Sequence, residues 1–140
     1  MKKILTIACV ILVCFVVLIF NLNAKKIDIG ESTKFSKEEV QAAVNCVMEN
    51  FEENFKKCYL LKLWYDEEES NSEIVTYMSF GKGSVNRVKR ENVIVLFSNF
   101  YVGGAGGKGS LNPYSIYNNW KWILIRDSES GNWKIDDSGY

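Results

Sequence analysis

"FSKEEVQAAVNCVMENFEENF", residues 35–55, is the stretch that decides the fold, because it predicts one long amphipathic helix. Ser36 and, three residues later, Glu39 have the pattern of a capping box, in which each side chain bonds the backbone N–H of the other residue. Phe35 and Val40 occupy the two positions of a hydrophobic staple. Apolar residues then recur at the helical period: Val40, Ala43, Val44, Val47, Met48, Phe51 and Phe55. This stripe predicts that the helix packs against a second layer of structure.

The residues after this helix predict mostly β-structure. β-Branched and aromatic residues predict strands over 58–67, 92–102, 115–127 and 132–137, with a short helix around 72–80. Two of these strands, 93–102 and 117–126, are apolar on both faces, whereas a sheet with one wet face alternates more cleanly. The long helix covers one face, and the other needs the short helix, a curled sheet, a partner or a ligand. We therefore expect an α+β domain, with both helices packed on a curved antiparallel sheet.

The N-terminal residues 1–24 are expected to lie outside that domain. Lys2 and Lys3 precede an uninterrupted apolar run over residues 4–20, which as a helix is about 25 Å long and close to the thickness of a bilayer core. The fold class that we predict thus includes an N-terminal membrane helix. It anchors the chain in the cell membrane as a single-pass protein, with the C-terminal domain outside the cytoplasm.

A cleaved signal sequence is the alternative interpretation of the same residues. The only candidate cleavage site follows Ala24, where Leu22 is a poor fit to the small-x-small pattern, and cleavage there gives a secreted protein. In both interpretations, residues 1–24 are a membrane anchor or signal segment, residues 25–34 a polar spacer and residues 35–140 an extracytoplasmic α+β domain.

The composition argues against several classes of function. The 140-residue chain carries 17 Lys and Arg and 17 Asp and Glu, a balance that does not suggest nucleic-acid binding. Histidine is absent, which removes the commonest general base and the usual metal ligand. Cys46 and Cys58 are twelve residues apart, about 18 Å along one helix, which is too far for a bridge. An intermolecular disulfide through Cys46 stays open. We expect no cofactor and no metal.

A glycine-rich stretch, "YVGGAGGKGSLNP" at residues 101–113, raises the question of a phosphate-binding loop. A P-loop has a glycine five residues before its Gly-Lys pair and a hydroxyl residue after it, and a helix follows. Here Val102 and Gly109 stand at those two positions, and Pro113 precedes a predicted strand. The stretch is therefore interpreted as a mobile connection between two strands, which would act as a flap if it has a function.

Aromatic residues on the last strands are the candidate wall of a ligand pocket. They are Tyr117, Trp120, Trp122, Trp133 and Tyr140, and Asp66 joins them as a polar candidate. Aromatic residues at alternating strand positions also simply fill a core, so both interpretations stay open. For acid–base chemistry the candidates are Asp66, beside Tyr65, and the adjacent Asp136 and Asp137, which point to opposite faces of a strand and do not form a pair.

The C-terminal half resembles a family of small uncharacterised proteins of Gram-positive anaerobes, known only as a domain of unknown function. The residues that carry the resemblance are Gly109 to Pro113, Tyr117 to Leu124 and Gly131 to Tyr140, with "FSKEEV" and "LWYDEE" further upstream. The family is similar to the nuclear-transport-factor-two-like superfamily, in which helices pack into a curved sheet that forms a cone. The resemblance thus implies a cone-like fold, and it implies no catalytic residue here.

These observations together predict a membrane-anchored or secreted domain without catalysis. It would bind a small apolar ligand or a protein partner, or form a homodimer, and its membrane contact would run through residues 4–20. The alternatives are a cone-fold hydrolase or isomerase that uses a single pocket Asp, and a purely structural envelope domain.

Overall fold

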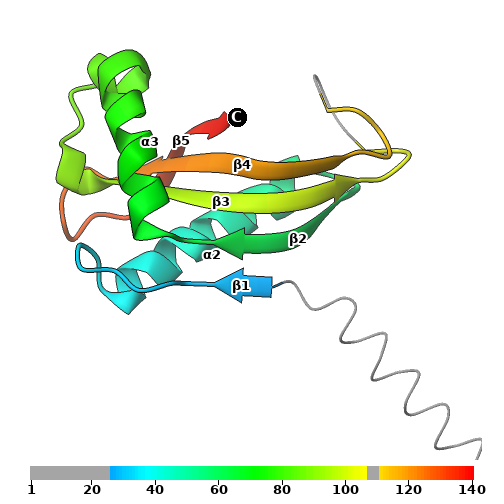
Figure 1. The fold of residues 1–140 in the computed structure, drawn as a ribbon, viewed down its shortest axis with the longest axis horizontal. Helices are drawn as coiled ribbons and strands as arrows, with labels where there is room; N and C mark the ends of the chain where they lie inside the picture. Colours follow the sequence, from blue (N-terminus) through cyan, green and yellow to red (C-terminus); the bar gives the residue numbers. More distant parts are fainter. Residues whose placement is uncertain (1–25, 107–110) are drawn as a thin grey trace, which may run out of the picture.

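The fold is α+β, with two helices and a five-stranded sheet, in a computed structural model that describes residues 26–106 and 111–140 (Figure 1). The elements in chain order are β1 (Lys26–Asp28), α2 (Lys37–Asn54), β2 (Cys58–Trp64), α3 (Glu67–Phe80), β3 (Val93–Val102), β4 (Ile116–Ile125) and β5 (Lys134–Gly139), with short 3-10 turns at Lys82–Ser84 and Arg90–Asn92. The predicted membrane segment over residues 4–20 and the centre of the glycine stretch, residues 107–110, lie outside the described residues.

The sheet is mixed, and its strands lie in the order in which they occur in the chain, β1-β2-β3-β4-β5. Strands β2 to β5 pair antiparallel, whereas β1 pairs parallel to β2, with Lys26 opposite Lys62. This first strand comes from the segment that the sequence predicted to be a polar spacer. Gly30, at φ +63°, then turns the chain toward α2, and its N–H donates to the Asp28 carboxylate.

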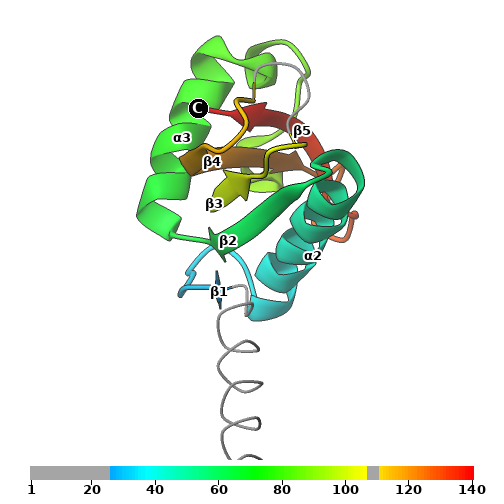
Figure 2. The same cartoon turned by 90° about the vertical axis from the view of Figure 1, so that its right-hand side faces the viewer.

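The two helices cover opposite faces of the sheet, as the end-on view shows (Figure 2). Helix α2 runs along the strands and buries Val40, Val47 and Phe51 in the larger core, together with Phe100 and Trp122 from the sheet. Helix α3 crosses one end of the strands on the other face (Figure 1). There it buries Ile74 and Tyr77 in a smaller core, against residues of β3 and β4.

Each helix begins at a residue whose side chain caps it. Ser36 accepts from the Glu39 N–H at 3.2 Å and Glu39 accepts from the Ser36 N–H at 2.8 Å, so the predicted capping box is confirmed. Asp66 accepts from the Glu69 N–H at 2.9 Å and caps α3, which therefore begins earlier than the short helix that the sequence predicted.

A carboxylate at the start of α3 fixes the loop between β1 and α2. Glu67, in the first turn of α3, accepts hydrogen bonds from the Ser32 hydroxyl, the Thr33 hydroxyl and the backbone N–H groups of Thr33 and Lys34. These bonds, those from the Ser32 and Thr33 hydroxyls foremost, lower the pKa of Glu67 from 4.5 to about 2. The loop therefore ties α3 to the entry of α2 across the edge of the sheet.

The predicted fold class is wrong in the form of the sheet, which is not an antiparallel cone: β1 joins it in parallel, and a helix packs on each face. Neither helix of the described residues is long and apolar enough to cross a membrane, and the predicted membrane segment at residues 4–20 lies outside them. The two-sided apolar strands predicted a covered second face, and α3 rather than closure of the sheet provides that cover at one end.

Candidate functional site

The aromatic residues named from the sequence lie at two separate ends of the α2 face, so they do not form one pocket. Trp122 is fully buried between them, and its indole N–H donates to the Ser98 hydroxyl at 2.8 Å. It also packs edge-on against Phe51 and Phe55. The ring of Trp122 is thus buried within the core and does not line an open pocket.

Tyr117 and Trp120 lie toward the C-terminal end of α2. Both pack against Phe100, and Tyr140 stacks on Tyr117 at a centroid distance of 6.0 Å. Both are half-buried, and the Tyr117 hydroxyl accepts from the Asn112 N–H. The buried indole nitrogen of Trp120 has no hydrogen-bond partner within the described ranges. This cluster closes the end of the core. Among the described residues, the indole nitrogen of Trp120 is its one buried side-chain polar atom without a hydrogen bond.

Trp133 lies at the opposite end, beside the first turns of α2. Its indole N–H donates to the backbone oxygen of Glu39 at 3.0 Å, and its ring packs edge-on against Phe35 at 5.7 Å. The backbone oxygen of Trp133 accepts from the Cys46 thiol at 3.4 Å. Trp133 therefore fastens the β4–β5 connection to α2 at two points, Glu39 and Cys46, which lie about two turns apart on the same face of the helix.

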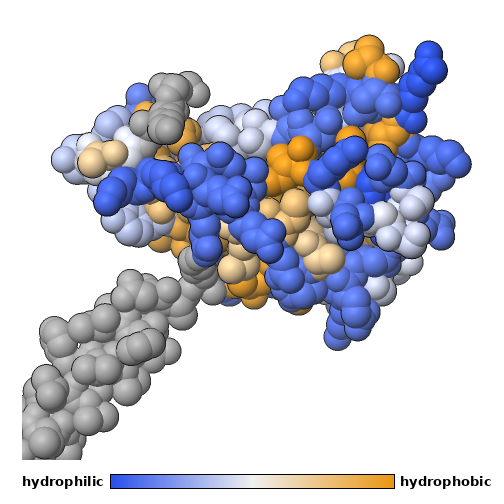
Figure 3. All heavy atoms as spheres, turned by 180° about the vertical axis from the view of Figure 1, so that it is seen from behind, coloured by the Kyte–Doolittle hydropathy of each residue, from blue (hydrophilic) through white to orange (hydrophobic). Residues whose placement is uncertain are grey.

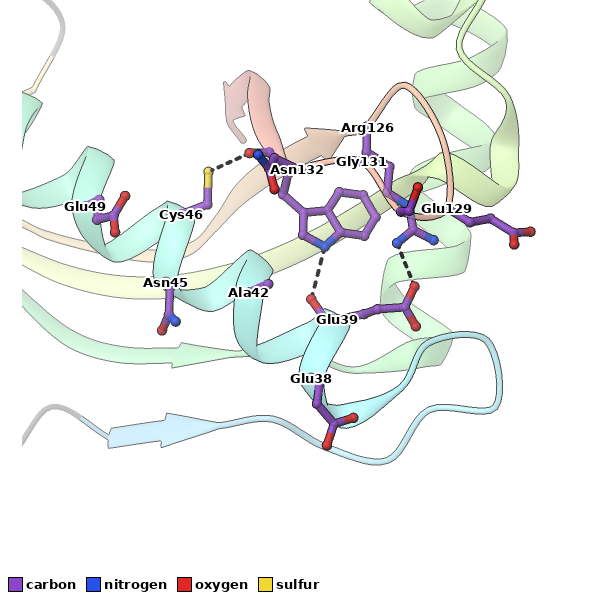
Figure 4. Close-up of a pocket in the computed structure, with 12 residues that line it drawn as sticks. Glu38, Glu39, Ala42, Asn45, Cys46, Glu49, Arg126, Glu129, Gly131 and Asn132 are labelled. Atoms are coloured by element: carbon purple, nitrogen blue, oxygen red, sulfur yellow. Dashed lines mark hydrogen bonds and ion pairs between the residues drawn. The ribbon is translucent and has the colours of Figure 1, made fainter.

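Arg126, the residue after β4, is the charged group at the centre of this region. Its side chain is 4% exposed, and one guanidinium N–H donates to Glu39 Oε1 at 2.6 Å (Figure 4). A second donates to the Asn92 side chain at 3.3 Å. The guanidinium also lies 4.5 Å from the centre of the Trp133 ring and 5.6 Å from that of Phe35. A cation enclosed in this way is paired and stacked, not free to meet a ligand.

Glu39 connects the cap of α2 to this cation. The hydrogen bond from the Ser36 N–H and then that from Arg126 hold the pKa of Glu39 below its usual value. The same carboxylate thus completes the capping box and neutralises Arg126. A residue that the sequence marks only as a helix signal is therefore also half of an ion pair.

A groove opens beside this ion pair, between α2 and the β4–β5 connection, with a volume of about 470 Å³. We call it the Arg126 groove; its lining residues are Glu38, Glu39, Ala42, Asn45, Cys46, Glu49, Arg126, Glu129, Ser130, Gly131, Asn132 and Trp133. In Figure 4, Glu38, Asn45 and Glu49 follow one another along α2 at its rim, and Glu129 lies across from them on the connection. The lining thus has four carboxylates against one cation.

Cys46 lies within the groove and is half-buried. Burial, and next the nearby Glu49 carboxylate, raise the pKa of its thiol. A thiol in that environment stays protonated at neutral pH and is a poor nucleophile. Cys46 forms no disulfide within the part of the chain that the structure describes.

A second and wider hollow of about 920 Å³ adjoins the groove on the far side of the same connection. The two share Arg126, Glu129 and Ser130, and the wider hollow adds charges of both signs, Arg87, Lys89 and Lys134 among the cations. The two hollows give an extended surface along this edge of the molecule. Its shape suits an elongated segment better than an enclosed small molecule.

The carboxylates predicted for acid–base chemistry are not gathered at one place. Asp66 is exposed and caps α3. Asp136 is half-buried and accepts from the Tyr77 hydroxyl at 2.7 Å, and this hydroxyl also accepts from the Asn86 amide. Burial and then the Asp136 bond raise the pKa of Tyr77. The half-exposed Asp137 lies 3.5 Å from Lys82. This pattern fixes α3 and its following loop to β5.

No group of three or more acidic or cysteine side chains within residues 26–106 and 111–140 has the geometry to hold a metal ion. The candidate flap falls in part on residues 107–110, which are not described. On its described side, Gly106 donates its N–H to the backbone oxygen of Gly103 in a tight turn. That part of the stretch has the form of a connection between β3 and β4.

The comparisons with known proteins identify a family without a known activity. Residues 31–139 match the family described as "Domain of unknown function (DUF4829)", and the chain belongs to this family. No curated protein and no solved structure matches it. The uncharacterised family expected from the sequence is thereby confirmed. The likeness to the nuclear-transport-factor-two-like superfamily and the origin in Gram-positive anaerobes stay predictions.

Trp133 was predicted from the sequence as a site residue, but its partners Arg126 and Glu39 were not. Arg126 sits at the end of an apolar strand, where a charged residue normally signals a surface position. Glu39 was assigned entirely to the capping box. One signal was available: an Arg directly after a two-sided apolar strand has its aliphatic stem in the core, and such a cation needs a carboxylate nearby.

Proposed function

We propose that this chain is a non-catalytic binding domain and that the Arg126 groove receives a positively charged segment of a partner protein. The observation that carries the proposal is the charge of the lining. Glu38, Glu49 and Glu129 are exposed at the rim, whereas Arg126 is buried and already paired with Glu39. The open part of the groove thus presents negative charge, and a Lys or Arg side chain of a partner complements it.

The indole of Trp133 adds apolar surface to this groove. Trp133 as a whole residue is 9% exposed, and it lines the groove together with the carboxylates and Arg126. A long basic side chain has an apolar stem and a charged head, so it can contact the ring with its stem while its head reaches Glu38 or Glu49. This combination favours a basic protein segment over an inorganic cation.

Fluorescently labelled pentalysine, mixed with the purified full-length chain, tests the charge preference by fluorescence anisotropy. We expect pentalysine to bind and pentaglutamate not to bind, and the affinity to fall as salt screens the carboxylates. The double substitution Glu38→Gln and Glu49→Gln should weaken binding about fivefold, because each exposed charge contributes about 0.5 kcal/mol.

The matched control changes two exposed glutamates outside the groove, Glu53→Gln on α2 and Glu68→Gln on α3. This control leaves the net charge equal to that of the groove variant. Equal weakening by both pairs would show a general charge effect and would contradict the proposed groove. Binding of pentaglutamate as tightly as pentalysine would contradict it as well.

The location of the domain is a second part of the proposal and rests on the sequence. We propose that residues 4–20 attach the chain to the cell membrane and that the remainder lies outside the cytoplasm; secretion after cleavage at Ala24 is the alternative. Intact cells treated with a membrane-impermeant maleimide report on this directly. With the native cysteines replaced by serine, a cysteine introduced at the exposed Ser79 on α3 should react in intact cells, whereas reaction only after lysis would contradict the location.

A further inference from the structure

The two faces of the sheet are not covered to the same extent, and the difference exposes a row of apolar side chains. Helix α3 packs over the start of β3, at Val93 and Val95, and over the end of β4. The other end of this face has no helix in front of it (Figure 1). There Tyr59, Tyr101 and Ile116 lie side by side on three adjacent strands, because Tyr59 pairs with Tyr101 and Tyr101 with Ile116.

This set, which we call the Tyr59 row, faces away from α2. Its neighbours Leu60, Phe100 and Tyr117 belong to the α2 core, and successive residues of a strand point to opposite faces. Tyr59 and Ile116 are each 58% exposed, and the rings of Tyr59 and Tyr101 stack at 6.2 Å. Leu61, 45% exposed, and Tyr114, 76% exposed, extend the apolar surface on either side. Contiguous exposed apolar residues of this kind mark an interaction surface.

The position at which the chain enters the sheet indicates that the Tyr59 row lies near the membrane attachment. Lys26 opens β1 opposite Lys62, so the chain enters the sheet next to Leu61, at the end that carries the Tyr59 row. The six peptide steps from Phe20 to Lys26 span at most about 20 Å when fully extended. Any membrane that holds residues 4–20 therefore lies within about 20 Å of Lys26, on the strand that adjoins β2 and its end of the row.

The charges at this end fit a lipid surface. Lys56 and Lys57 occupy the turn before β2, and the backbone oxygen of Lys57 accepts from the Gly103 N–H at the end of β3. Lys26 and Lys62 lie on the adjoining strands. Asp28, two residues after Lys26, lies further along β1 opposite Trp64, and Glu52 and Glu53, the acidic residues nearest to Lys56 in sequence, belong to α2 on the other side of the sheet. Tyrosine side chains prefer the membrane–water interface, and lysines attract anionic head groups.

Resting on the proposed membrane attachment, we propose that the Tyr59 row and the four lysines around it dock the domain onto an anionic bilayer surface. The bilayer covers the half of the sheet that α3 leaves open. Docking fixes the orientation of the domain, so the Arg126 groove, at the opposite end of the strands, faces away from the membrane. A partner protein then approaches the groove without obstruction by lipid.

A fluorescent reporter in full-length chain tests the docking. The four native cysteines are replaced by serine, a single Ile116→Cys is labelled with the polarity-sensitive dye NBD, and the chain is inserted in phosphatidylcholine vesicles with or without phosphatidylglycerol. A quencher on the lipid head group should quench this label several-fold more in the anionic vesicles. The matched control label replaces Val85, which is 77% exposed on the connection into the start of β3. It should stay unquenched.

The outcomes separate the proposals. A chain that does not float with vesicles overturns both the attachment and the docking. A chain that floats while its labels at 116 and 85 are quenched equally overturns the docking alone and leaves the attachment in place. A label at 116 whose emission shifts with protein concentration in detergent shows that a second copy covers the row, which also overturns it. Replacing Lys56 and Lys57 by Gln should abolish the preference for phosphatidylglycerol; an unchanged preference contradicts the role of the lysines.

Discussion

The two faces of one sheet have different uses in this protein. On the α2 face a helix of eighteen residues runs along the strands, and rings from Phe51, Phe55, Phe100 and Trp122 pack edge-on into a continuous core. On the α3 face a helix of fourteen residues crosses the strands at one end and leaves the Tyr59 row exposed. Because α2 lies along the strands and α3 lies across them, the same two-sided apolar strands give a complete core on one face and an open surface on the other.

The surface of the molecule agrees with this contrast. Seen from the α2 side, hydrophilic residues cover most of the molecule, and hydrophobic residues appear between them in smaller groups (Figure 3). The outer face of α2 carries the glutamates of the Arg126 groove. The α2 side thus presents charge, whereas the open half of the other face presents apolar side chains to its surroundings.

Truncation of the α2 core should have the largest effect. Trp122→Ala removes a fully buried indole and its bond to Ser98, and we expect a loss of about 4 kcal/mol in the free energy of unfolding. Urea denaturation followed by circular dichroism measures it. Ile116→Ala, on the same strand but in the Tyr59 row, should cost less than about 0.5 kcal/mol. Similar losses from the two variants would contradict the contrast between the faces.

The ion pair at the margin of the α2 core should come second. Arg126→Ala leaves Glu39 without its partner and removes the cation that packs on Trp133, and we expect a loss of about 3 kcal/mol. Arg126→Met keeps the apolar stem and should recover part of this loss. If Arg126→Met and Arg126→Ala have the same free energy of unfolding in the urea titration, the packing of the Arg126 stem on the rings does not contribute to stability.

The smaller α3 core depends on a polar contact whose loss should lower the free energy of unfolding less than the loss of Trp122 or Arg126. Tyr77→Phe removes the hydroxyl that donates to Asp136 and accepts from Asn86, and we expect a loss of about 2 kcal/mol. Thermal unfolding detects a change of that size. Tyr59→Phe, at an exposed tyrosine in the same sheet, serves as the control and should leave the midpoint unchanged. An equal shift in both variants would mean that the Tyr77–Asp136 bond does not hold α3.

The smallest effect is expected from pH, through the carboxylate that ties α3 to the loop before α2. The pKa of Glu67 falls from 4.5 in the unfolded chain to about 2 in the fold, so its contribution is present above pH 4.5 and is lost as the pH falls toward 2. Urea midpoints at several pH values between 6 and 2 measure this loss. Glu67→Gln should flatten the curve in that window while Glu39, whose pKa is also lowered, keeps a residual slope. An unchanged slope would contradict the role of Glu67.

Prediction from sequence succeeded where neighbours along the chain decide the structure. The capping box of Ser36 and Glu39 joins residues three apart, and the apolar stripe of α2 repeats within each helical turn, so both are legible in a short window. The strand prediction at 92–102 likewise agrees with β3 at Val93–Val102.

Prediction failed where distant residues decide the structure. The three residues of β1 carry no strand signal and form a strand only because β2 offers its free edge. The aromatic candidates were treated as one set, although Trp133 and Trp120 lie at opposite ends of α2 and Trp122 is in the core between them. Alternation along a strand shows which face of the sheet a side chain lies on. It does not show against which part of a helix the side chain packs.

The sequence by itself thus determined the long helix α2, the strand β3 and the apolar character of both sheet faces, because hydrogen bonding and periodicity act over a few residues. Only the tertiary structure decided the direction in which each helix crosses the sheet. That direction buries Arg126 beside Glu39 and leaves Tyr59 and Ile116 exposed. The physical reason is that coverage of a sheet depends on the packing angle of whole helices, which no short window of residues contains.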